Sequence, residues 1–370
     1  MKQNQSGQQP VRVLHAVTYM GRGGIETMIM NYYRQIDRSK VQFDFLVHRD
    51  FRADYDDEIE SLGGRIYRLP PMVIWHRSYY KALNSFFTEH PEYRIVHSHL
   101  NCMSTVILKA AKKHGVPVRI AHSHAYGTRF VVRDYYRVRL PGVSTQLLAC
   151  GKQAGDWMFR GAAYRVIPNA IDVDRYIYDP LKRREIRASL GIPAGAFVLG
   201  HIGRLNYIKN HTFLINVFAE VKKQKPESVL LLVGDGELRD ELEKKVKDLG
   251  LGDSVVFTGI RSDVPDLTQA MDCFVFPSLT EGLPVALVEA QAAGLPCLIS
   301  TGVPPEAAMI SETRHVELSA GAAHWAKLAL ECSKLPRLDT RAAIAEAGFD
   351  IKMNAEYLQN YYLEHGKVEV

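Results

Sequence analysis

The stretch from Pro277 to Ala290 holds two carboxylates with seven residues between them, an arrangement suited to binding a nucleotide. Glu281 lies in a predicted loop, and Glu289 lies in the helix that follows, about two turns on. Between them, the amides of Gly282 and Leu283 lie at the start of this helix, where unpaired N–H groups attract phosphate or sugar oxygens. A carboxylate at Glu289 suits both hydroxyls of a ribose. The alternative is a pair of capping side chains on a surface helix.

A second candidate for anion binding follows an apolar run. Gly203 and Arg204 come directly after this run, and Lys209 precedes a predicted helix. The planar guanidinium of Arg204 and the ammonium of Lys209 could hold one diphosphate from two sides. Two cations offset the charge of a leaving diphosphate, so this chemistry requires no metal. Two solvated basic residues in a loop are the alternative.

Two shorter glycine loops are weaker signals. Gly23 and Gly24 lie between a predicted first strand and first helix, where their N–H groups could approach an anion. Gly234 follows a later strand, at its carboxyl end. A tight turn explains the first loop equally well, and a helix N-cap by Asp235 explains the second.

Apolar runs alternate with amphipathic helical patterns along most of the chain, which predicts the α/β class. In the first half we predict strands at 11–17, 43–47, 65–69, 95–97, 118–121 and 147–149, and helices at 25–36, 56–62, 80–89 and 103–114. In the second half we predict strands at 197–202, 229–233, 255–258, 273–276 and 296–300. The helices there are expected at 211–224, 237–249, 264–270, 284–293 and 354–364. Such alternation implies doubly wound parallel sheets, which bind ligands outside the carboxyl ends of their strands. Two such halves facing each other would make a cleft between domains.

Composition narrows the class of protein. The chain has 370 residues, 46% hydrophobic and 24% charged, which excludes a disordered chain, a collagen and a coiled coil. No apolar run approaches the about 18–20 residues that span a bilayer, and the first ten residues lack the apolar core of a signal peptide. Five scattered cysteines without a C-x-x-C pair indicate reduced thiols in a cytoplasmic protein.

Charge is unevenly distributed. Residues 1–165 carry 24 basic and 13 acidic side chains, whereas residues 166–370 carry 22 and 28. Within the basic half, Arg129, Arg133, Arg137 and Arg139 alternate with apolar and aromatic residues. In a helix the first three would share a face, which predicts a weak interfacial contact with an anionic membrane. A solvated basic helix is the alternative, and no nucleic-acid-binding module accompanies the segment, so we expect no nucleic-acid partner.

The motifs and their order resemble the family 4 glycosyltransferases, which are retaining, nucleotide-sugar-dependent enzymes of the GT-B fold. The resemblance covers almost the whole chain. It rests on GGIE at 23–26, IPNAID at 167–172, GRLNYIKN at 203–210, VGDGEL at 233–238, VVFTG at 255–259, FPSLTEGLPVALVEAQAAGLPCL at 276–298 and the last, tyrosine-bearing helix. Residues 13–37 and 43–48 further resemble bacterial capsule and exopolysaccharide transferases.

The resemblance implies two Rossmann-like domains and assigns roles to the residues above. The first domain would comprise 1–166 with the C-terminal helix 352–370 and receive the acceptor, and 167–351 would bind the donor. Arg204 and Lys209 would hold the donor diphosphate, and Glu289 the ribose. Glu281, with the Gly282 and Leu283 amides, would meet the donor sugar or its phosphate. Further donor contacts are expected from Gly23, Gly24, Gly203, Gly234, Gly259, Ile260 and Arg261.

Relatives also carry a histidine near the reacting carbon of the donor sugar. Here the strand runs into His122 and His124, of which we favour His124 as the catalytic residue and keep His122 as the alternative. His97 and His99 end the previous strand and are expected to line the cleft or support the structure. Four histidines at two strand ends could suggest a metal, but the family needs none and no carboxylate joins them, so we predict no metal site.

The expected reaction is transfer of a hexose, with retention and without a metal, from a nucleotide donor to an acceptor. A UDP-sugar is the expected donor, and a saccharide or a polyprenyl-linked saccharide of capsule or exopolysaccharide is the expected acceptor. The enzyme would be cytoplasmic, held peripherally at the inner face of the plasma membrane, and the sequence predicts no oligomeric state. Two alternatives remain: a nucleotide-sugar epimerase of the same fold, and a catalytically silent sugar-nucleotide binding protein. The chain departs from the family at Thr301–Glu306, where many members carry Gly-Gly-x-x-Glu, so no role is assigned to Glu306.

Overall fold

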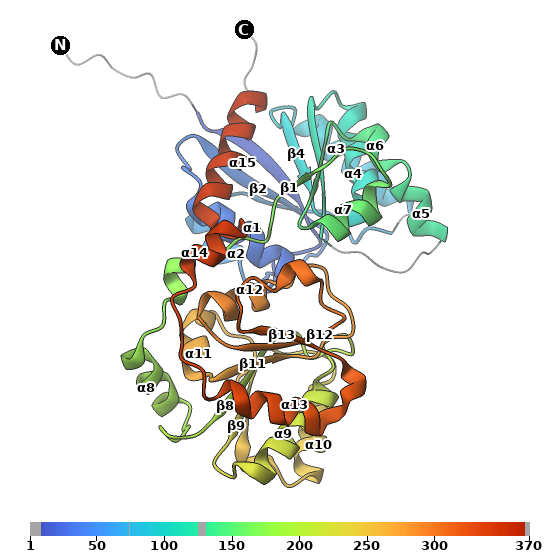
Figure 1. Ribbon diagram of the computed structural model, residues 1–370. Coiled ribbons are helices and arrows are strands. Elements are labelled where there is room, and N and C mark those ends of the chain that lie inside the picture. The colour runs from blue at the N-terminus through green and yellow to red at the C-terminus, as the bar shows by residue number, and fades with distance from the viewer. Residues whose placement is uncertain (1–8, 74, 125–130, 367–370) are drawn as a thin grey trace, which may run out of the picture. The chain divides into compact units, whose positions relative to one another are not determined.

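The computed structural model describes residues 9–73, 75–124 and 131–366. The chain forms two compact units, one ending at Pro168 and resumed from Ile351, the other comprising Asn169–Asp350. The sequence analysis placed these two boundaries after residues 166 and 351. Each unit is a parallel sheet with helices on both of its faces (Figure 1).

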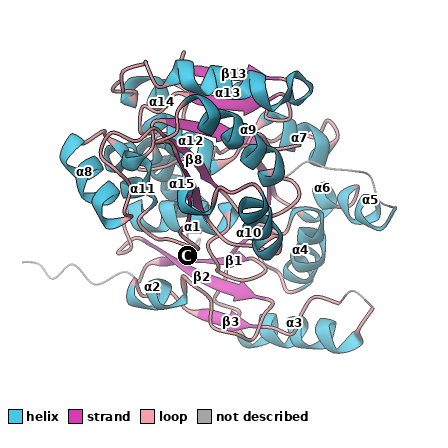
Figure 2. Cartoon of the chain, turned by 90° about the horizontal axis from the view of Figure 1, so that it is seen from below, coloured by secondary structure: helices cyan, strands magenta, loops and turns pink. Residues whose placement is uncertain are grey.

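The sheet of the first unit has the strand order β3-β2-β1-β4-β5-β6-β7. Its inner strands are buried along almost their whole length, because helices cover both faces of a parallel sheet and select continuous apolar runs. Figure 2 shows β1, β2 and β3 side by side at one end of this sheet. The strands are β1 Val11–Ala16, β2 Val41–Val47, β3 Ile66–Arg68, β4 Ile95–Ser98, β5 Val118–Ser123, β6 Gln146–Ala149 and β7 Arg165–Val166.

Helices α1 and α15 pack on one face of this sheet, and α3 and α4 pack on the other (Figure 1). The C-terminal helix α15 thereby belongs to the first unit, where it contacts β1, β2 and β4. The helices are α1 Gly24–Gln35, α2 Asp56–Ser61, α3 Arg77–Glu89, α4 Ser104–Lys113, α5 Val131–Arg137, α6 Leu140–Val143, α7 Lys152–Phe159 and α15 Ile351–Gly366.

The second unit has a sheet of order β10-β9-β8-β11-β12-β13. Its core is built by Trp325, Phe218 and aliphatic side chains packed beneath the central strands. The strands are β8 Val198–Ile202, β9 Val229–Val233, β10 Val255–Phe257, β11 Cys273–Phe276, β12 Cys297–Ser300 and β13 Thr313–Val316. The sequence analysis missed β13, because this edge strand is half exposed and carries a polar sequence instead of an apolar run.

Helices α9, α10 and α13 cover one face of this sheet, and α8, α11 and α12 cover the other (Figure 1). The alternative interpretation, in which Asp235 caps a helix, is wrong, because α10 begins only at Arg239 and the Asp235 carboxylate accepts a hydrogen bond from the Gly236 amide instead. The helices are α8 Pro180–Ser189, α9 His211–Gln224, α10 Arg239–Asp248, α11 Val264–Ala270, α12 Val285–Ala292, α13 Gly321–Cys332 and α14 Arg341–Glu346.

Two further expectations concern the whole chain. All five cysteines are buried and free, as the scattered sequence pattern predicted. Among the described helices, none combines the length and the apolar character needed to cross a bilayer.

Candidate active site

In the second unit, the loops that follow β8, β9 and β10 are joined by backbone hydrogen bonds. The Gly203 amide donates to the carbonyl of Val233, and the Gly234 amide donates to the carbonyl of Gly259, each over 2.9 Å. Gly234 has a φ of +131°, and a Cβ at this position would collide with the Gly203 carbonyl oxygen. The close approach of the two loops therefore requires glycine at position 234. It brings Gly203, Gly234 and Gly259 of the predicted donor site together at the carboxyl end of the sheet.

Lys209 and Glu281, 72 positions apart, form an ion pair in this region. Lys209 Nζ lies 2.7 Å from Glu281 Oε1, and the two side chains are only 17% and 12% exposed. The ammonium also lies 4.5 Å from the centre of the Phe276 ring. The Leu279 amide donates to the Ile208 carbonyl over 2.8 Å, which ties the two loops together. The structure thus unites two residues that the sequence analysis assigned to the donor, and it fixes the position of the lysine charge.

Arg204 is held much less firmly. Its Nε lies 3.1 Å from Glu237 Oε2, and the two side chains are 65% and 56% exposed. An exposed pair of this kind contributes little to stability, so it breaks at little cost. Arg204 can therefore exchange Glu237 for an incoming anion, whereas Lys209 is already in place.

Glu289 is buried within α12, and its carboxylate accepts a hydrogen bond from the Tyr176 hydroxyl over 2.6 Å. Burial raises the pKa of the Glu289 carboxyl, while the bond from Tyr176 opposes that rise. Glu289 was predicted from the sequence but Tyr176 was not, since it lies 113 positions away at the end of a short 3₁₀-helix, Val173–Tyr176. One carboxylate oxygen is therefore oriented by the protein, and the other has no hydrogen bond to a described residue.

Gly282 and Leu283, whose amides are expected to meet the donor, lie just before α12. The helix begins at Val285 after Pro284, and no side chain caps its first turn in the described structure. Leu283 is buried, and its carbonyl accepts a hydrogen bond from the Asn169 side chain over 2.8 Å. This bond fixes the loop through Gly282 that leads into the helix.

The remaining residues proposed for the second unit have different surroundings. Ile260 is 55% exposed in the loop after β10, so its side chain is accessible to the base of a nucleotide. Arg261 is paired with Asp263 over 2.8 Å, so its guanidinium is already occupied. Glu306 lies exposed in a short turn of 3₁₀-helix, Pro305–Ala307.

In the first unit, the glycine loop leads directly into α1. Gly23 precedes the helix with an extended backbone, and Gly24, its first residue, is exposed with open space where a Cβ would lie. The N–H groups of this first turn are therefore accessible to an anion. Glu26 lies in the same turn, and burial raises the pKa of its carboxyl to about 7. Because the carboxyl keeps its proton up to near neutral pH, it adds little negative charge where an anion is expected.

We expect Glu26→Gln to stabilise the protein above pH 7. The native carboxyl holds its proton up to about pH 7, whereas a carboxyl of the unfolded chain releases it near the ordinary value of 4.5, so the free energy of unfolding of the wild type falls between these two pH values. Glu26→Gln lacks this decline, so at pH 8 its free energy of unfolding should exceed that of the wild type by about 1–2 kcal/mol. The gain is smaller than the full pKa shift would give, because Glu26 is partly exposed. Thermal melts from pH 4.5 to 8 measure it, with exposed Glu356→Gln as the control. Parallel pH profiles of wild type and Glu26→Gln would contradict the expectation.

Five histidines of the first unit gather on one face of its sheet. His97 lies in β4 and His122 lies in β5, while His99 and His124 lie just beyond the ends of these two strands. The register of β1 on β4 places His15 beside His97. Side chains two apart on a strand point to the same face, so all five lie together. We call these five residues the imidazole cluster. The sequence analysis saw four of them and missed His15, whose only signal is a polar residue within a buried strand.

Hydrogen bonds between ring nitrogens connect the imidazole cluster. His99 lies between His15, at 3.0 Å, and His124, at 2.9 Å. His97 lies between His122, at 3.2 Å, and the Tyr362 hydroxyl of α15, at 2.6 Å. Burial lowers the pKa of His15 and of His124 to about 3 and moves the pKa of the other three well below its ordinary range. The rings are therefore neutral near pH 7.

The two predicted catalytic histidines differ in access. His122 is 2% exposed, whereas His124 is partly exposed and its amide donates to the Asn101 side chain over 2.9 Å. Asn101 adopts a left-handed conformation with a φ of +51° and follows β4 in the chain. Of the two, His124 is thus the better placed to contact a ligand from outside the sheet. His97 and His99 are buried within the imidazole cluster.

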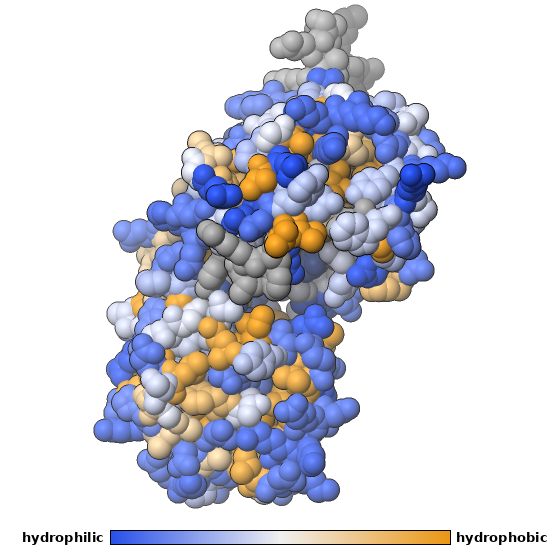
Figure 3. Space-filling view, turned by 90° about the vertical axis from the view of Figure 1, so that its right-hand side faces the viewer, coloured by the Kyte–Doolittle hydropathy of each residue, from blue (hydrophilic) through white to orange (hydrophobic). Residues whose placement is uncertain are grey.

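The expectation of one basic helical face at Arg129, Arg133 and Arg137 is wrong. Arg137 is buried: it pairs with Asp134 over 2.8 Å, and its guanidinium lies over the Trp157 ring. Arg129 lies outside the described residues. Helix α5 instead exposes apolar side chains, and Figure 3 shows the side on which it lies, with orange apolar patches among blue hydrophilic ones. The exposed apolar residues are Val131, Val132, Tyr135 and Val138, with Arg133 and Arg139 exposed beside them.

Comparison with known proteins identifies the family. The family model described as glycosyl transferases group 1 matches residues 182–348, and the model described as glycosyltransferase family 4 matches residues 22–175. The glycosyltransferase EpsF of Bacillus subtilis is 36% identical over 95% of this chain and 96% of its own length. The chain belongs to the family 4 glycosyltransferases. A further relative of this glycosyltransferase is an Escherichia coli enzyme described as UDP-Gal:alpha-D-GlcNAc-diphosphoundecaprenol alpha-1,3-galactosyltransferase, 31% identical over 56% of this chain and 58% of that enzyme.

Solved structures show the same fold. Anabaena HepE in complex with UDP-glucose superposes with a TM-score of 0.77 and 21% identity, covering 95% of this chain and 99% of HepE. The lipopolysaccharide glycosyltransferase WaaG has a TM-score of 0.70 and 16% identity, covering 94% and 99%. This glycosyltransferase therefore has the GT-B fold that the motifs predicted, with two Rossmann-like units.

Proposed function

We propose that this glycosyltransferase moves a hexose from a nucleotide donor, a UDP-sugar in the first instance, to a saccharide or polyprenyl-linked acceptor in capsule or exopolysaccharide assembly. The observation that carries the proposal is the Lys209–Glu281 pair, held among glycine loops at the carboxyl end of the second sheet. The Escherichia coli galactosyltransferase, as a relative, supports a UDP-sugar and an undecaprenol-linked acceptor.

The proposed mechanism assigns the diphosphate to two cations. Lys209 would contact it from a fixed position, and Arg204 would leave Glu237 to bind it from a second side. Negative charge grows on the diphosphate as the bond from its oxygen to the anomeric carbon breaks, so these contacts strengthen in the transition state. With two cations present, a metal on the diphosphate is not required. His124 is proposed to contact the donor sugar as a neutral ring.

The anomeric configuration would be retained because the acceptor attacks the anomeric carbon from the same face that the diphosphate leaves. The acceptor hydroxyl forms its bond to the anomeric carbon, and its proton passes to the departing phosphate oxygen. Glu281 is occupied by Lys209, so we do not assign it the role of a covalent nucleophile. In this proposal Glu281 positions Lys209 and meets the donor.

Nucleotide release in the presence of an acceptor tests the proposal. UDP, GDP and ADP are first compared for thermal stabilisation of the purified protein, and UDP is expected to stabilise it most. Matching nucleotide sugars are then incubated with lipid-linked or free saccharides, with free UDP and the anomeric configuration of the product as readouts. Conversion of the donor into an epimer without nucleotide release would favour an epimerase, and binding without any turnover would favour a silent binding protein. Activity lost in EDTA and restored by Mg²⁺ or Mn²⁺ would contradict the metal-free mechanism.

We further propose weak attachment to an anionic membrane through α5. Exposed Val131, Val132 and Tyr135 could enter the interface, while Arg133 and Arg139 meet anionic headgroups. Each basic residue near such a surface contributes about 1 kcal/mol, and the attraction fades within about 8–10 Å at physiological salt. Such a contact would bring the enzyme to a polyprenyl-linked acceptor.

We expect Arg133→Ser with Arg139→Ser to reduce flotation with anionic liposomes at low salt by about tenfold or more. The control is Lys81→Ser with Lys109→Ser, which removes the same charge from exposed positions on α3 and α4 of the same unit. Arg137 is left unchanged because its side chain supports the fold. Equal losses in both double variants would show a dependence on total charge alone and would contradict a docking role for α5.

A further inference from the structure

The imidazole cluster contains polar atoms that the protein leaves unsatisfied. Nε2 of His15, Nε2 of His122 and Nδ1 of His124 are buried and have no hydrogen-bond partner among the described residues. A buried polar group without a partner destabilises the folded state, so three such atoms in one place call for an explanation.

Counting protons shows that the rings do not satisfy one another. A neutral imidazole carries one N–H donor and one acceptor nitrogen. In the chain His15–His99–His124, the donors can point in either of two directions. Either direction leaves an unpaired donor at one end and an unpaired acceptor at the other. The cluster is therefore incomplete as a hydrogen-bonded network of protein groups alone.

A small cavity lies beside the cluster and is lined by four of its five members. Its volume is about 10 Å³, close to the space that one water molecule needs, and His15, His97, His99 and His122 face it. The other lining residues are mainly apolar side chains of β2, α1 and α15. The space is thus of the size of a single small ligand.

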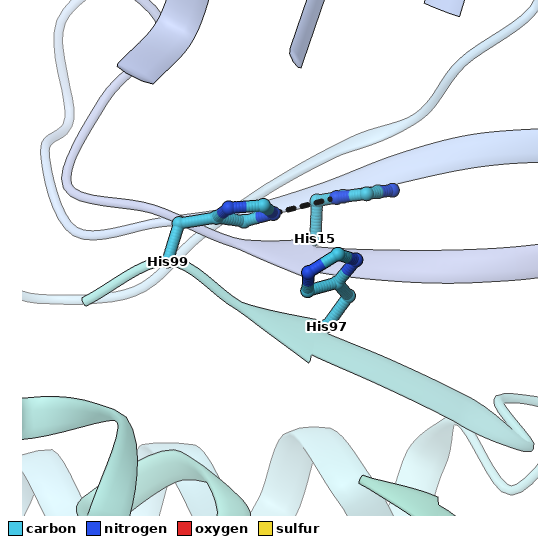
Figure 4. Close-up of side chains that lie close together, drawn as sticks. All are labelled: His15, His97 and His99. Carbon is cyan, nitrogen blue, oxygen red and sulfur yellow. Dashed lines mark hydrogen bonds between the residues drawn. The ribbon is translucent and has the colours of Figure 1, made fainter. Parts of the chain in front are cut away.

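In contrast to the expectation from the sequence that the chain has no metal site, we propose that His15, His97 and His99 bind a first-row transition-metal ion of the Zn²⁺ class. One nitrogen from each residue lies within 4.8 Å of the others, and all three residues are buried. Figure 4 shows the rings converging from two adjacent strands, with His15 Nδ1 and His99 Nε2 3.0 Å apart. Three nitrogens around zinc at 2.0–2.1 Å would be about 3.3 Å from one another. His97 and His99 are stacked, with ring centres 4.2 Å apart and 27° between the ring planes, so their rings would have to turn before both nitrogens point at one ion.

The surroundings of His97 and His99 match those of metal ligands, whereas the second nitrogen of His15 has no partner among the described residues. Histidines that bind metals use their second nitrogen for a hydrogen bond that orients the ring. Nδ1 of His97 has such a bond with the Tyr362 hydroxyl, and Nδ1 of His99 has one with His124.

The three imidazole nitrogens also favour some metal ions over others. Imidazole suits zinc, copper, nickel and iron, whereas Mg²⁺ and Ca²⁺ prefer carboxylate and carbonyl oxygens. The site is therefore distinct from the diphosphate chemistry proposed above, which involves the other unit and needs no ion. Tyr362 lies on α15, so an ion here would fasten the C-terminal helix to the first sheet and stabilise that unit.

A second triad, His99, His122 and His124, also has nitrogens within 4.8 Å of one another. We favour the first triad because all three of its members line the cavity, whereas His124 does not. His15 belongs only to the first triad and His124 only to the second, so variants at these two positions separate them.

Co²⁺ is the probe for the experiment, because its visible absorption reports coordination by nitrogen. Tag-free protein is treated with a chelator, freed of it and titrated with Co²⁺ and, separately, with Zn²⁺, while thermal stability is followed. We expect one ion per chain, a visible band and a higher melting temperature. His15→Phe should weaken binding by at least about 10–100-fold, since loss of an outer partner already costs that much.

His15→Phe suits this test because the ring already lies 4.0 Å from Phe43, centre to centre, so an apolar ring should fit. His324→Ala, at an exposed position of the second unit, is the control and should bind Co²⁺ as the wild type does. Tyr362→Phe keeps all three ligands and should weaken binding about tenfold or more. If His15→Phe fails to fold, Tyr362→Phe provides the test. No saturable band in the wild type, or a band lost in His124→Phe but kept in His15→Phe, would overturn the assignment.

Discussion

Lys209→Ala is expected to lower kcat by about 100-fold or more, with a much smaller change in the affinity for UDP. The lysine is positioned before the donor arrives, by the Glu281 carboxylate at 2.7 Å and by the Phe276 ring. Removing one preorganised donor to a developing negative charge costs about 10²–10³ in rate. The loss falls on turnover because the charge on the departing diphosphate grows in the transition state.

Two companion variants sharpen this prediction. Arg204→Ala should also lower kcat, but it should leave stability unchanged, because the pair with Glu237 is exposed. Glu281→Gln should lower kcat while keeping the loop intact, because the amide still accepts a hydrogen bond from Lys209. Lys244→Ala, on the exposed side of α10, is the control for loss of a positive charge. Steady-state kinetics with the preferred donor, together with titration calorimetry with UDP, give both quantities. If Lys209→Ala keeps wild-type turnover, the proposed diphosphate contact is wrong.

The sequence predicted most elements of the sheets, because buried parallel strands consist of continuous apolar residues that stand out in the chain. The strands Val229–Val233 and Cys273–Phe276 were predicted to the residue. The edge strands β7 and β13 were missed because they are short or exposed and therefore carry no such run. Helix α13 was missed although its buried Trp325 packs in the core, since its Ala-rich first turn lacks a clear start signal.

The candidate site could be predicted only in part. Motif spacing located Lys209, Glu281 and Glu289 individually, because each lies next to a glycine loop or a helix start. Their partners depend on which strands are neighbours: Lys209 meets Glu281 because β8 and β11 are adjacent, although 72 positions separate the two residues. The same reason explains why His15 was missed, since only the pairing of β1 with β4 places it beside His97.

Glu289→Gln is expected to weaken binding of UDP by about tenfold to 100-fold and to reduce the preference for UDP over 2′-deoxy-UDP. In the proposed complex the carboxylate accepts hydrogen bonds from the ribose hydroxyls, and bonds to a charged group contribute about 1.5–3 kcal/mol. The substitution preserves the shape of the side chain, and its amide oxygen can still accept the bond from Tyr176. The protein should therefore fold, and the loss should report the missing charge.

The comparison with 2′-deoxy-UDP separates ribose binding from a purely structural role of Glu289. A structural defect would weaken the binding of both nucleotides equally, whereas loss of a ribose contact weakens the binding of UDP more than that of 2′-deoxy-UDP. The pH adds a second readout: burial raises the pKa of the Glu289 carboxyl, so wild-type affinity for UDP should begin to fall at a higher pH than for an ordinary glutamate as the solution is acidified. Glu289→Gln should lack this part of the pH dependence. Exposed Glu346→Gln in the same unit should keep wild-type values throughout, and an unchanged ratio of the two affinities in Glu289→Gln would refute the ribose assignment.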